Sequence, residues 1–415
     1  MSIRGVVLPL CFGLMIITPA FSQEETVAIK FEGLVECAIR QSPAIQIIER
    51  RYDLTGTERK MDLQWANPEF NYSQEDAGGQ MEQYLTLSKQ IEMPWVYTSR
   101  QRSWEDQLES AKYKKEDRIR LFISELKGGY IELKLLETQL AHLNRLKDII
   151  VNVSDVAQDQ LKEGALSGVD QHLIQMILVN INARLQTIKR ASRAVESKWK
   201  TNMGIDASAY LQLLTEIHFL PVELENLDHY LSSISNIPGY RQREKTKSAI
   251  QNQILMERRR LIPHFSLFGG YKKLESDQDG YVAGISIPLP LLNQNRAVIQ
   301  KQQISLEIAN SELEQYQQIL QGQIKTLVST SQNLGTSLEM TKIHFSKNQD
   351  MMESIQTSYQ EGWMTLTEML NAVELQADGI QAFYKQLTDY YRSIFQLEAI
   401  IGKTLVNFSP QKGAE

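Results

Sequence analysis

The chain has 415 residues, 42% of them hydrophobic, which is enough apolar content for a substantial fold of one or two domains. Its 44 basic and 50 acidic side chains give a net charge of −6, so the composition offers no electrostatic argument for a nucleic-acid partner. The histidines lack the spacing of a helical metal site, and no glycine-rich phosphate loop occurs. We therefore predict a protein that is not an enzyme and that holds no metal ion and no cofactor.

The first 23 residues predict a secretory signal peptide. A positively charged start precedes an apolar run over residues 5–18 and a small-residue exit at Pro19–Gln23. The run is too short for a lasting transmembrane helix, which disfavours the alternative of a retained N-terminal anchor. Cys11 lies within this segment, so Cys37 is the only cysteine of the mature chain and no intramolecular disulfide can form. We expect the mature protein to act beyond the inner membrane.

The mature chain is a tandem repeat. Prolines and glycines that punctuate the sequence recur in the same order at offsets of 195 to 198 positions. The pairs are Pro43 and Pro238, Pro68 and Pro263, Pro94 and Pro290, Gly164 and Gly362, and Gly204 and Gly402. We divide the chain into a signal peptide at 1–23, a first repeat at 24–205, a second repeat at 206–407 and a C-terminal tail at 408–415.

Each repeat begins with a helical segment, which in the first repeat is interrupted at Pro43 and continues to Ala66. A β-hairpin follows in each repeat, because polarity alternates on both sides of a glycine-rich or polar turn. The chain is therefore expected to contribute four strands. They are predicted at residues 70–74, 81–93, 265–271 and 281–287.

After each hairpin runs an uninterrupted helical pattern of roughly 60 residues or more. In the first repeat apolar residues recur at three-, four- and seven-residue steps, which predicts the seam of a coiled coil. These residues are Phe122, Leu126, Leu133, Leu136, Leu140, Leu143 and Ile150. Such a helix would be on the order of 90 Å long. No apolar stretch of about 18 residues follows the signal, so a bilayer crossing would require strands in a closed barrel.

The two helical patterns reverse direction at short tips. Residues 162–168 and 360–365 interrupt the periodicity before the helix resumes. We expect a glycine to end the first helix of each hairpin, and Ser167 or Thr365 to cap the helix that follows. The two repeats should therefore each form a long antiparallel pair of helices.

These segments together resemble the TolC-type outer membrane factors, and within them the heavy-metal efflux branch typified by CzcC and CusC. The resemblance covers essentially the whole mature chain. It is carried by residues 32–43 (EGLVECAIRQSP), 67–70 (NPEF), 284–295 (GISIPLPLLNQN) and 359–372 (YQEGWMTLTEMLNA). The Ile-Pro-Leu-Pro strand end and the Tyr-x-x-Gly-x-x-Thr tip are the most specific motifs.

The resemblance implies a mainly α fold with a small β part. Two tandem helix-strand-strand-helix repeats would form long helical hairpins of an α-barrel and four strands of a twelve-stranded transmembrane β-barrel shared by a homotrimer. The implied function is an exit duct in the outer membrane with a long periplasmic extension. It would pass heavy-metal cations received from a periplasmic membrane-fusion adaptor and an inner-membrane transporter of the resistance-nodulation-division (RND) type. Four strands cannot close a barrel alone, which agrees with an oligomer embedded in outer-membrane lipid.

The same resemblance places the adaptor contact at the two tips. The implied residues are Gly164, Ala165, Leu166 and Ser167 in the first tip and Gly362, Trp363, Met364 and Thr365 in the second. The alternative is that these are only turns with capping residues. Leu166, Trp363 and Met364 are expected to be exposed, and apolar side chains at a water-facing tip favour a contact with a partner.

The narrow periplasmic aperture is implied just past the second tip. Threefold repetition would turn Glu368 into a ring of carboxylates that favours cations, whereas the alternative is a solvated glutamate on a helix surface. Asn371 stands one turn later, where some members carry a second acid. Asp170 and Tyr359 are candidates for contacts that hold a closed state. The arginine that some relatives use nearby is Met364 here, which argues against a salt-bridged lock.

The sequence is compatible with two groups of alternative functions. The same duct architecture serves drug efflux and polypeptide secretion, and the identity of the inner-membrane transporter would separate these cases. A soluble periplasmic coiled-coil scaffold or adaptor is the alternative from a different class. That alternative leaves the alternating strands that end at Met93 and Pro290 without a role, and an adaptor should carry a lipoyl-like β segment that the sequence lacks.

Overall fold

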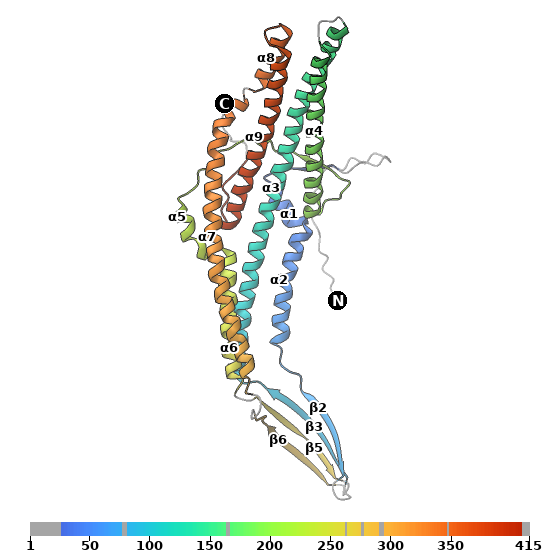
Figure 1. Ribbon diagram of the computed structural model, residues 1–415. Helices are drawn as coiled ribbons and strands as arrows, with labels where there is room; N and C mark the ends of the chain where they lie inside the picture. Colours follow the sequence, from blue (N-terminus) through green and yellow to red (C-terminus); the bar gives the residue numbers. More distant parts are fainter. Residues whose placement is uncertain are drawn as a thin grey trace, which may run out of the picture.

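The computed structural model describes residues 26–76, 81–162, 167–261, 264–274, 278–289, 294–346 and 348–408. The chain is an elongated body with long helices along its length and a four-stranded sheet at one end (Figure 1). The tips of the helical hairpins lie at the opposite end. The predicted signal peptide, the residues Gly164, Ala165 and Leu166, and all of the predicted tail except Phe408 lie outside the described residues.

The helices follow the same order in both halves of the chain. Pro43, Pro94 and Pro238 each occupy the first turn of a helix, where proline's missing N–H costs nothing. The second helix ends at Asp62, before the predicted Ala66, in the stretch that leads to the breaker Asn67-Pro68. The helices are α1 (Leu34–Gln41), α2 (Pro43–Asp62), α3 (Pro94–Lys162), α4 (Gly168–Met203), α5 (Leu227–Ser232), the 3₁₀ helix η1 (Ile234–Asn236), α6 (Pro238–Arg259), α7 (Arg296–Ser346), α8 (Asn348–Gln360) and α9 (Leu366–Ile401).

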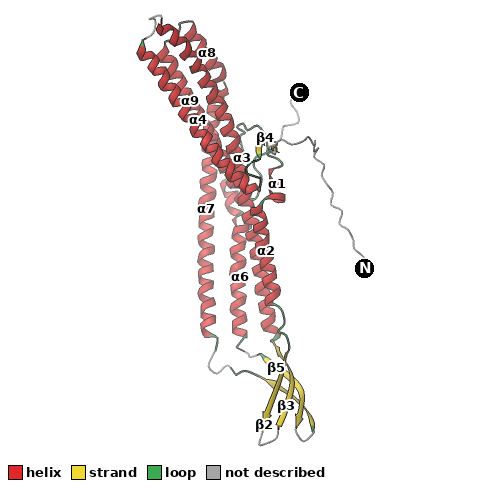
Figure 2. Cartoon of the chain, turned by 90° about the vertical axis from the view of Figure 1, so that its right-hand side faces the viewer, coloured by secondary structure: helices red, strands yellow, loops and turns green. Residues whose placement is uncertain are grey.

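The sheet contains the four predicted strands: β2 (Glu69–Asp76), β3 (Met81–Ile91), β5 (Phe265–Leu274) and β6 (Asp279–Ser286). Their order is β2-β3-β5-β6, with every neighbouring pair antiparallel. The pairing of β3 with β5 joins the two repeats. Each strand is followed or preceded by a long helix, so α2, α3, α6 and α7 contact one another in the same order as the strands (Figure 2).

A second, two-stranded sheet was not predicted. β1 (Thr26–Ile29) pairs in parallel with β4 (Tyr210–Leu213), and Thr26 lies opposite Tyr210. Each strand has four residues, which is too short for polarity alternation to distinguish it from a loop. This sheet ties the start of the first repeat to the start of the second.

The main core lies where α3, α4 and α9 pack together. The predicted coiled-coil seam of α3 is confirmed, because four of its residues are buried and the other three pack against the core. The buried residues are Leu126, Leu133, Leu143 and Ile150, and the partly buried ones are Phe122, Leu136 and Leu140. At 69 residues, α3 also has the predicted length.

Tyrosine hydroxyl groups hold the irregular segment that links the repeats. Tyr391 donates to the carbonyl of His218 at 2.6 Å and accepts from the amide of Leu220 at 3.1 Å. Tyr390 donates to the carbonyl of Leu220 and accepts from the amide of Val222, both at 3.1 Å. Each hydroxyl thus satisfies two backbone groups that no helix or strand supplies with partners. The linker is thereby fixed to α9.

Among the described residues, no helix combines the length and the apolarity that a crossing of a lipid bilayer would require.

Candidate functional site

The second tip is a short turn closed by backbone hydrogen bonds. Gly362 has a φ of +75°, which glycine adopts without steric cost. Its amide donates to the carbonyl of Tyr359 at 3.1 Å, and the amide of Trp363 donates to the carbonyl of Ser358 at 2.8 Å. These two bonds form a Schellman motif that ends α8. The predicted role of glycine at this tip is confirmed.

A reciprocal cap begins the helix after the tip. The hydroxyl of Thr365 accepts from the amide of Glu368 at 3.3 Å, and the carboxylate of Glu368 accepts from the amide of Thr365 at 2.9 Å. The hydroxyl of Thr365 also donates to that carboxylate at 2.7 Å. These hydrogen bonds from Thr365 lower the pKa of Glu368 below its usual value. The proposed aperture residue is thus exposed and tied to the cap of its own helix.

The first tip repeats this arrangement at its described end. Ser167 caps α4 by accepting from the amide of Asp170 at 3.2 Å, and the Asp170 carboxylate accepts from the amide of Ser167 at 3.3 Å. Asp170 and Glu368 therefore occupy equivalent positions in the two repeats, as predicted. The caps at Ser167 and Thr365 are both confirmed.

The two described apolar residues of the second tip differ in exposure. Trp363 is 79% exposed, as predicted. The prediction for Met364 was wrong, because this residue is half-buried and packs against the main hydrophobic core. Its amide donates to the carbonyl of Ser358 at 3.2 Å, so the turn holds Met364 beside the end of α8. Trp363 is therefore the large apolar side chain that the described part of this tip presents to solvent.

The two tips influence each other electrostatically. Burial raises the pKa of Tyr359 on α8, and the negative charge of Asp170 on α4 raises it further. A Coulomb effect of this kind requires the two side chains to be near each other. Tyr359 and Asp170, each predicted as a candidate for closed-state contacts, thus lie near each other within one chain. Asn371 lies exposed on α9.

Polar pairs also join the two helical hairpins further from the tips. Asn180 on α4 donates its side-chain amide to Glu374 on α9 at 2.9 Å. One turn further along both helices, Arg184 forms an ion pair with Asp378 at 2.5 Å. These contacts connect the first repeat to the second near the end of the molecule that carries the tips.

The four-stranded sheet has two chemically different faces. The register places Phe70 opposite Leu87, Tyr72 opposite Leu85, and Tyr271 opposite Tyr281. Because directly opposed residues of a sheet share a face, most of the large apolar side chains lie on one side. Eight of these are exposed. They are Phe70, Tyr72, Leu85, Leu87, Leu267, Tyr271, Tyr281 and Ile285.

The opposite face carries mostly hydroxyl, amide and charged side chains. The same register brings Asn71, Ser73, Tyr84, Thr86, Ser88, Ser266 and Ser286 to this side. Lys272 bridges to Glu82 at 2.7 Å across the neighbouring strands and lies over the ring of Tyr84. Among the described residues, this face carries two aromatic side chains, Tyr84 and Phe268. The ring of Phe268 covers the backbone of Gly284, which has no side chain of its own.

Sequence reasoning did not assign these faces. The alternation was visible in the pairs Phe70 with Tyr72 and Leu85 with Leu87, but a single strand does not show which residues of its neighbours share its side. The register supplies that information. Within the described ranges, no group of three or more His, Cys, Asp or Glu side chains is placed to hold a metal ion.

Comparison with known families matches residues 233–403 to the family described as "outer membrane efflux protein". A comparison with curated proteins finds no match. Among solved structures, CusC is 13% identical with a TM-score of 0.73, covering 93% of this chain and 95% of its own. The CmeC outer membrane channel of Campylobacter jejuni is 13% identical with a TM-score of 0.77 and coverages of 91% and 87%. The outer membrane protein VceC of Vibrio cholerae is 14% identical with a TM-score of 0.75 and coverages of 91% and 97%.

Proposed function

We propose that this chain is a member of the outer membrane efflux proteins and forms one subunit of a trimeric exit duct in the outer membrane. The family match over residues 233–403 and the channel-like fold of the chain support this proposal. The duct passes a cargo from an inner-membrane transporter and a periplasmic adaptor to the outside. It carries out no chemical reaction of its own.

The observation that supports this proposal most directly is the two-faced sheet. A sheet of four strands with apolar side chains exposed on one face and polar ones on the other is suited to lipid on one side and water on the other. Its outer strands, β2 and β6, each have one neighbour among the described residues. Unpaired strand edges are costly in lipid, so pairing β2 of one copy with β6 of the next would satisfy them. Three copies would supply twelve strands.

The helices suit the periplasmic part of such a duct. The layer of α2, α3, α6 and α7 continues directly from the strands, so a closed ring of sheets implies a closed ring of helices below it. At about 1.5 Å per residue, the 69 residues of α3 span roughly 100 Å. We place the adaptor contact at the tips, with Ser167, Gly362, Trp363 and Thr365 among its residues together with the segment Gly164–Leu166.

The aperture of the duct is proposed beside the second tip. Glu368 would form a ring of three carboxylates, and Tyr359 with Asp170 would hold the closed state. The cargo is proposed to be a heavy-metal cation delivered by an RND pump, by analogy with the branch that the sequence resembles. An exit duct selects its cargo weakly, because the inner-membrane pump has already chosen it.

The experiment that tests the duct is membrane fractionation followed by native mass measurement of the detergent-extracted complex. A heat-sensitive trimer in the outer-membrane fraction is the expected result. A soluble periplasmic monomer would refute the duct and favour the coiled-coil scaffold. The cargo is tested separately, by comparing the sensitivity of a deletion strain to copper and zinc salts with its sensitivity to drugs.

A further inference from the structure

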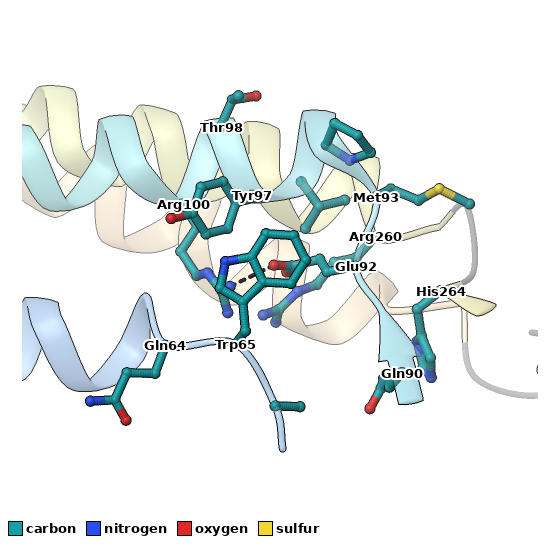
Figure 3. Close-up of a pocket in the computed structure, with 13 residues that line it drawn as sticks. Gln64, Trp65, Gln90, Glu92, Met93, Tyr97, Thr98, Arg100, Arg260 and His264 are labelled. Carbon is teal, nitrogen blue, oxygen red and sulfur yellow. Dashed lines mark hydrogen bonds and ion pairs between the residues drawn. The ribbon is translucent and has the colours of Figure 1, made fainter. Parts of the chain in front are cut away.

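A cavity of about 600 Å³ lies where the helices meet the sheet (Figure 3). Its walls come from the segment after α2, the end of β3, the start of α3, and the two residues Arg260, just after α6, and His264, just before β5. A cavity of this size matches those that hold small organic ligands in other proteins. It lies far along the chain from both tips and is not used by the proposed adaptor contact.

One wall of the cavity is apolar and aromatic. The rings of Trp65 and Tyr97 lie 6.0 Å apart between centroids, and Met93 and Val96 complete the wall. Figure 3 shows Trp65 reaching from the segment after α2 toward the start of α3. Trp65 is nevertheless 64% exposed, which is unusual for a side chain with so large an apolar surface. An apolar ligand in the cavity would cover it.

Two cations of the chain lie against the aromatic rings of the cavity. Lys89 lies 5.8 Å from the ring of Trp65, and Arg100 lies 5.7 Å from the ring of Tyr97. The chain's own cations therefore lie beside both aromatic rings, which leaves little attraction for a cationic ligand. Among the described residues, the one carboxylate that lines the cavity is Glu92, which is bonded to Arg100 at 2.5 Å. Asp62 lies 3.9 Å from the same guanidinium group, so both carboxylates are occupied by Arg100.

Arg260 supplies the remaining positive charge of the lining. It forms an ion pair with the buried Glu257 at 3.0 Å, and 44% of its side chain is exposed. A guanidinium group has five N–H donors, so one ion pair leaves donors that can bind a phosphate or a carboxylate. His264 also lines the cavity.

We propose that this cavity binds an amphiphile with an anionic head group, a carboxylate or a phosphate, held by Arg260, and an apolar body packed against Trp65 and Tyr97. Two sources can supply this chemistry. One is an anionic lipid of the surrounding bilayer, and the other is a free amphiphile such as a fatty acid. The inference goes beyond the proposed duct. The free amphiphile does not require the duct, because the cavity lies within a single chain, whereas the lipid source rests on the proposed membrane location.

The test uses the full chain purified in a neutral maltoside detergent. Bromine quenches tryptophan fluorescence at short range, so 11-bromoundecanoate should quench Trp65 saturably, and 11-bromoundecanol should bind at least about tenfold more weakly. Arg260→Gln should weaken binding of the acid about tenfold, because it removes a charge-assisted hydrogen bond. Arg258→Gln is the matched control. Arg258 lies two residues before Arg260, at the end of α6, and is exposed, but it does not line the cavity. Trp65→Phe should remove the saturable quenching.

The two sources are separated by analysing lipids that remain with the complex purified from membranes. An anionic lipid retained by the wild type and by Arg258→Gln, but lost from Arg260→Gln, would identify the lipid. Saturable binding of the bromoundecanoate without a retained lipid would identify a free amphiphile. Equal binding of the acid and the alcohol, or no effect of Arg260→Gln in a variant with unchanged circular dichroism, would overturn the proposal. Neither result depends on the oligomeric state, so failure here and failure of the duct are distinguishable.

Discussion

Two adjacent glycines of α3 lie in different surroundings. A Cβ atom at Gly128 would meet no atom within 4 Å, whereas one at Gly129 would lie 2.7 Å from Cδ1 of Trp199. Trp199 is buried, and its indole N–H donates to the carbonyl of Leu126 at 3.0 Å. Only Gly129 is therefore required by packing, and it allows α4 to approach α3 closely.

This difference predicts opposite effects of the same substitution. Gly128→Ala should raise stability by about 0.5–1 kcal/mol, because alanine favours the helix. Gly129→Ala should lower it by about 1–3 kcal/mol, because the ring of Trp199 must move. Thermal unfolding followed by circular dichroism of the two variants checks the prediction. A loss of stability in both variants would show that Gly128 has a role that its open surroundings do not reveal.

The cap formed by Thr365 and Glu368 predicts a dependence on pH. The pKa of Glu368 is lowered, so its contribution is complete above the carboxyl group's usual pKa and is lost as pH falls through the lowered pKa. Hydrogen exchange of the peptide that covers the start of α9, corrected for intrinsic rates, should accelerate over that range. Glu368→Gln keeps an acceptor but removes the titration, so its corrected exchange should not change with pH. If exchange in Glu368→Gln accelerated at low pH as it does in the wild type, the cap would be excluded as the cause of the pH dependence.

Sequence patterns predicted the helix caps and the turn at the tips, but they did not predict which tip side chains are buried. The caps at Ser167 and Thr365 and the glycine at 362 followed from the sequence, because a cap depends on neighbours within four positions. The exposure of Met364 did not, because it depends on the core formed by α3, α4 and α9. The closeness of Tyr359 and Asp170 was not predicted either, because the family resemblance named each only as a candidate for a closed-state contact.

At the scale of the helices, α3 and α9 are joined by a buried ion pair. Lys127 bonds to Glu398 at 2.6 Å, with side chains that are 13% and 7% exposed. The other carboxylate oxygen of Glu398 accepts from the amides of Leu405 and Val406 at 2.6 and 3.0 Å. The pair thus fixes the chain that follows α9 as well as the two helices.

Removing one residue of this buried ion pair should lower the stability of the fold much more than removing one residue of a surface ion pair. Lys127→Met leaves a buried carboxylate without its cation, so stability should fall by about 3 kcal/mol. Lys198→Met is the matched control on α4, because its ion pair with Glu125 on α3 is exposed and should be worth less than about 1 kcal/mol. Chemical unfolding measures both. Addition of Glu398→Gln to Lys127→Met should recover part of the loss, and a further loss would contradict this account.

The long elements were predictable and the short ones were not. Heptad spacing and punctuating residues located α3, α4 and α9, because many residues contribute to each signal. The four-residue strands β1 and β4 form only because they pair with each other across 184 positions, from Thr26 to Tyr210. Tertiary pairing of this kind leaves no local pattern in either segment.

At the scale of the whole molecule, the two faces of the sheet make the clearest prediction. Leu87→Lys places a charge on the apolar face, and in a bilayer this should cost about 2–4 kcal/mol near the midplane. Thr86→Lys places the same charge on the polar face, where water is expected, and should be tolerated. The amount of heat-modifiable complex in the outer-membrane fraction checks both variants. Equal assembly of the two would refute contact of the apolar face with lipid.

The pairing of β3 with β5 also constrains the order in which the protein can form. The pair of Glu82 with Leu274 cannot form until Leu274 has been synthesised, 192 residues after Glu82. The pairing of β1 with β4 requires almost as many additional residues. Until then the first half of the chain carries strands with unpaired backbone groups, which can add to another strand. Because the N-terminus is synthesised first, the growing chain is therefore vulnerable to aggregation during about half of its synthesis. Expression of the first repeat alone should yield this aggregating species.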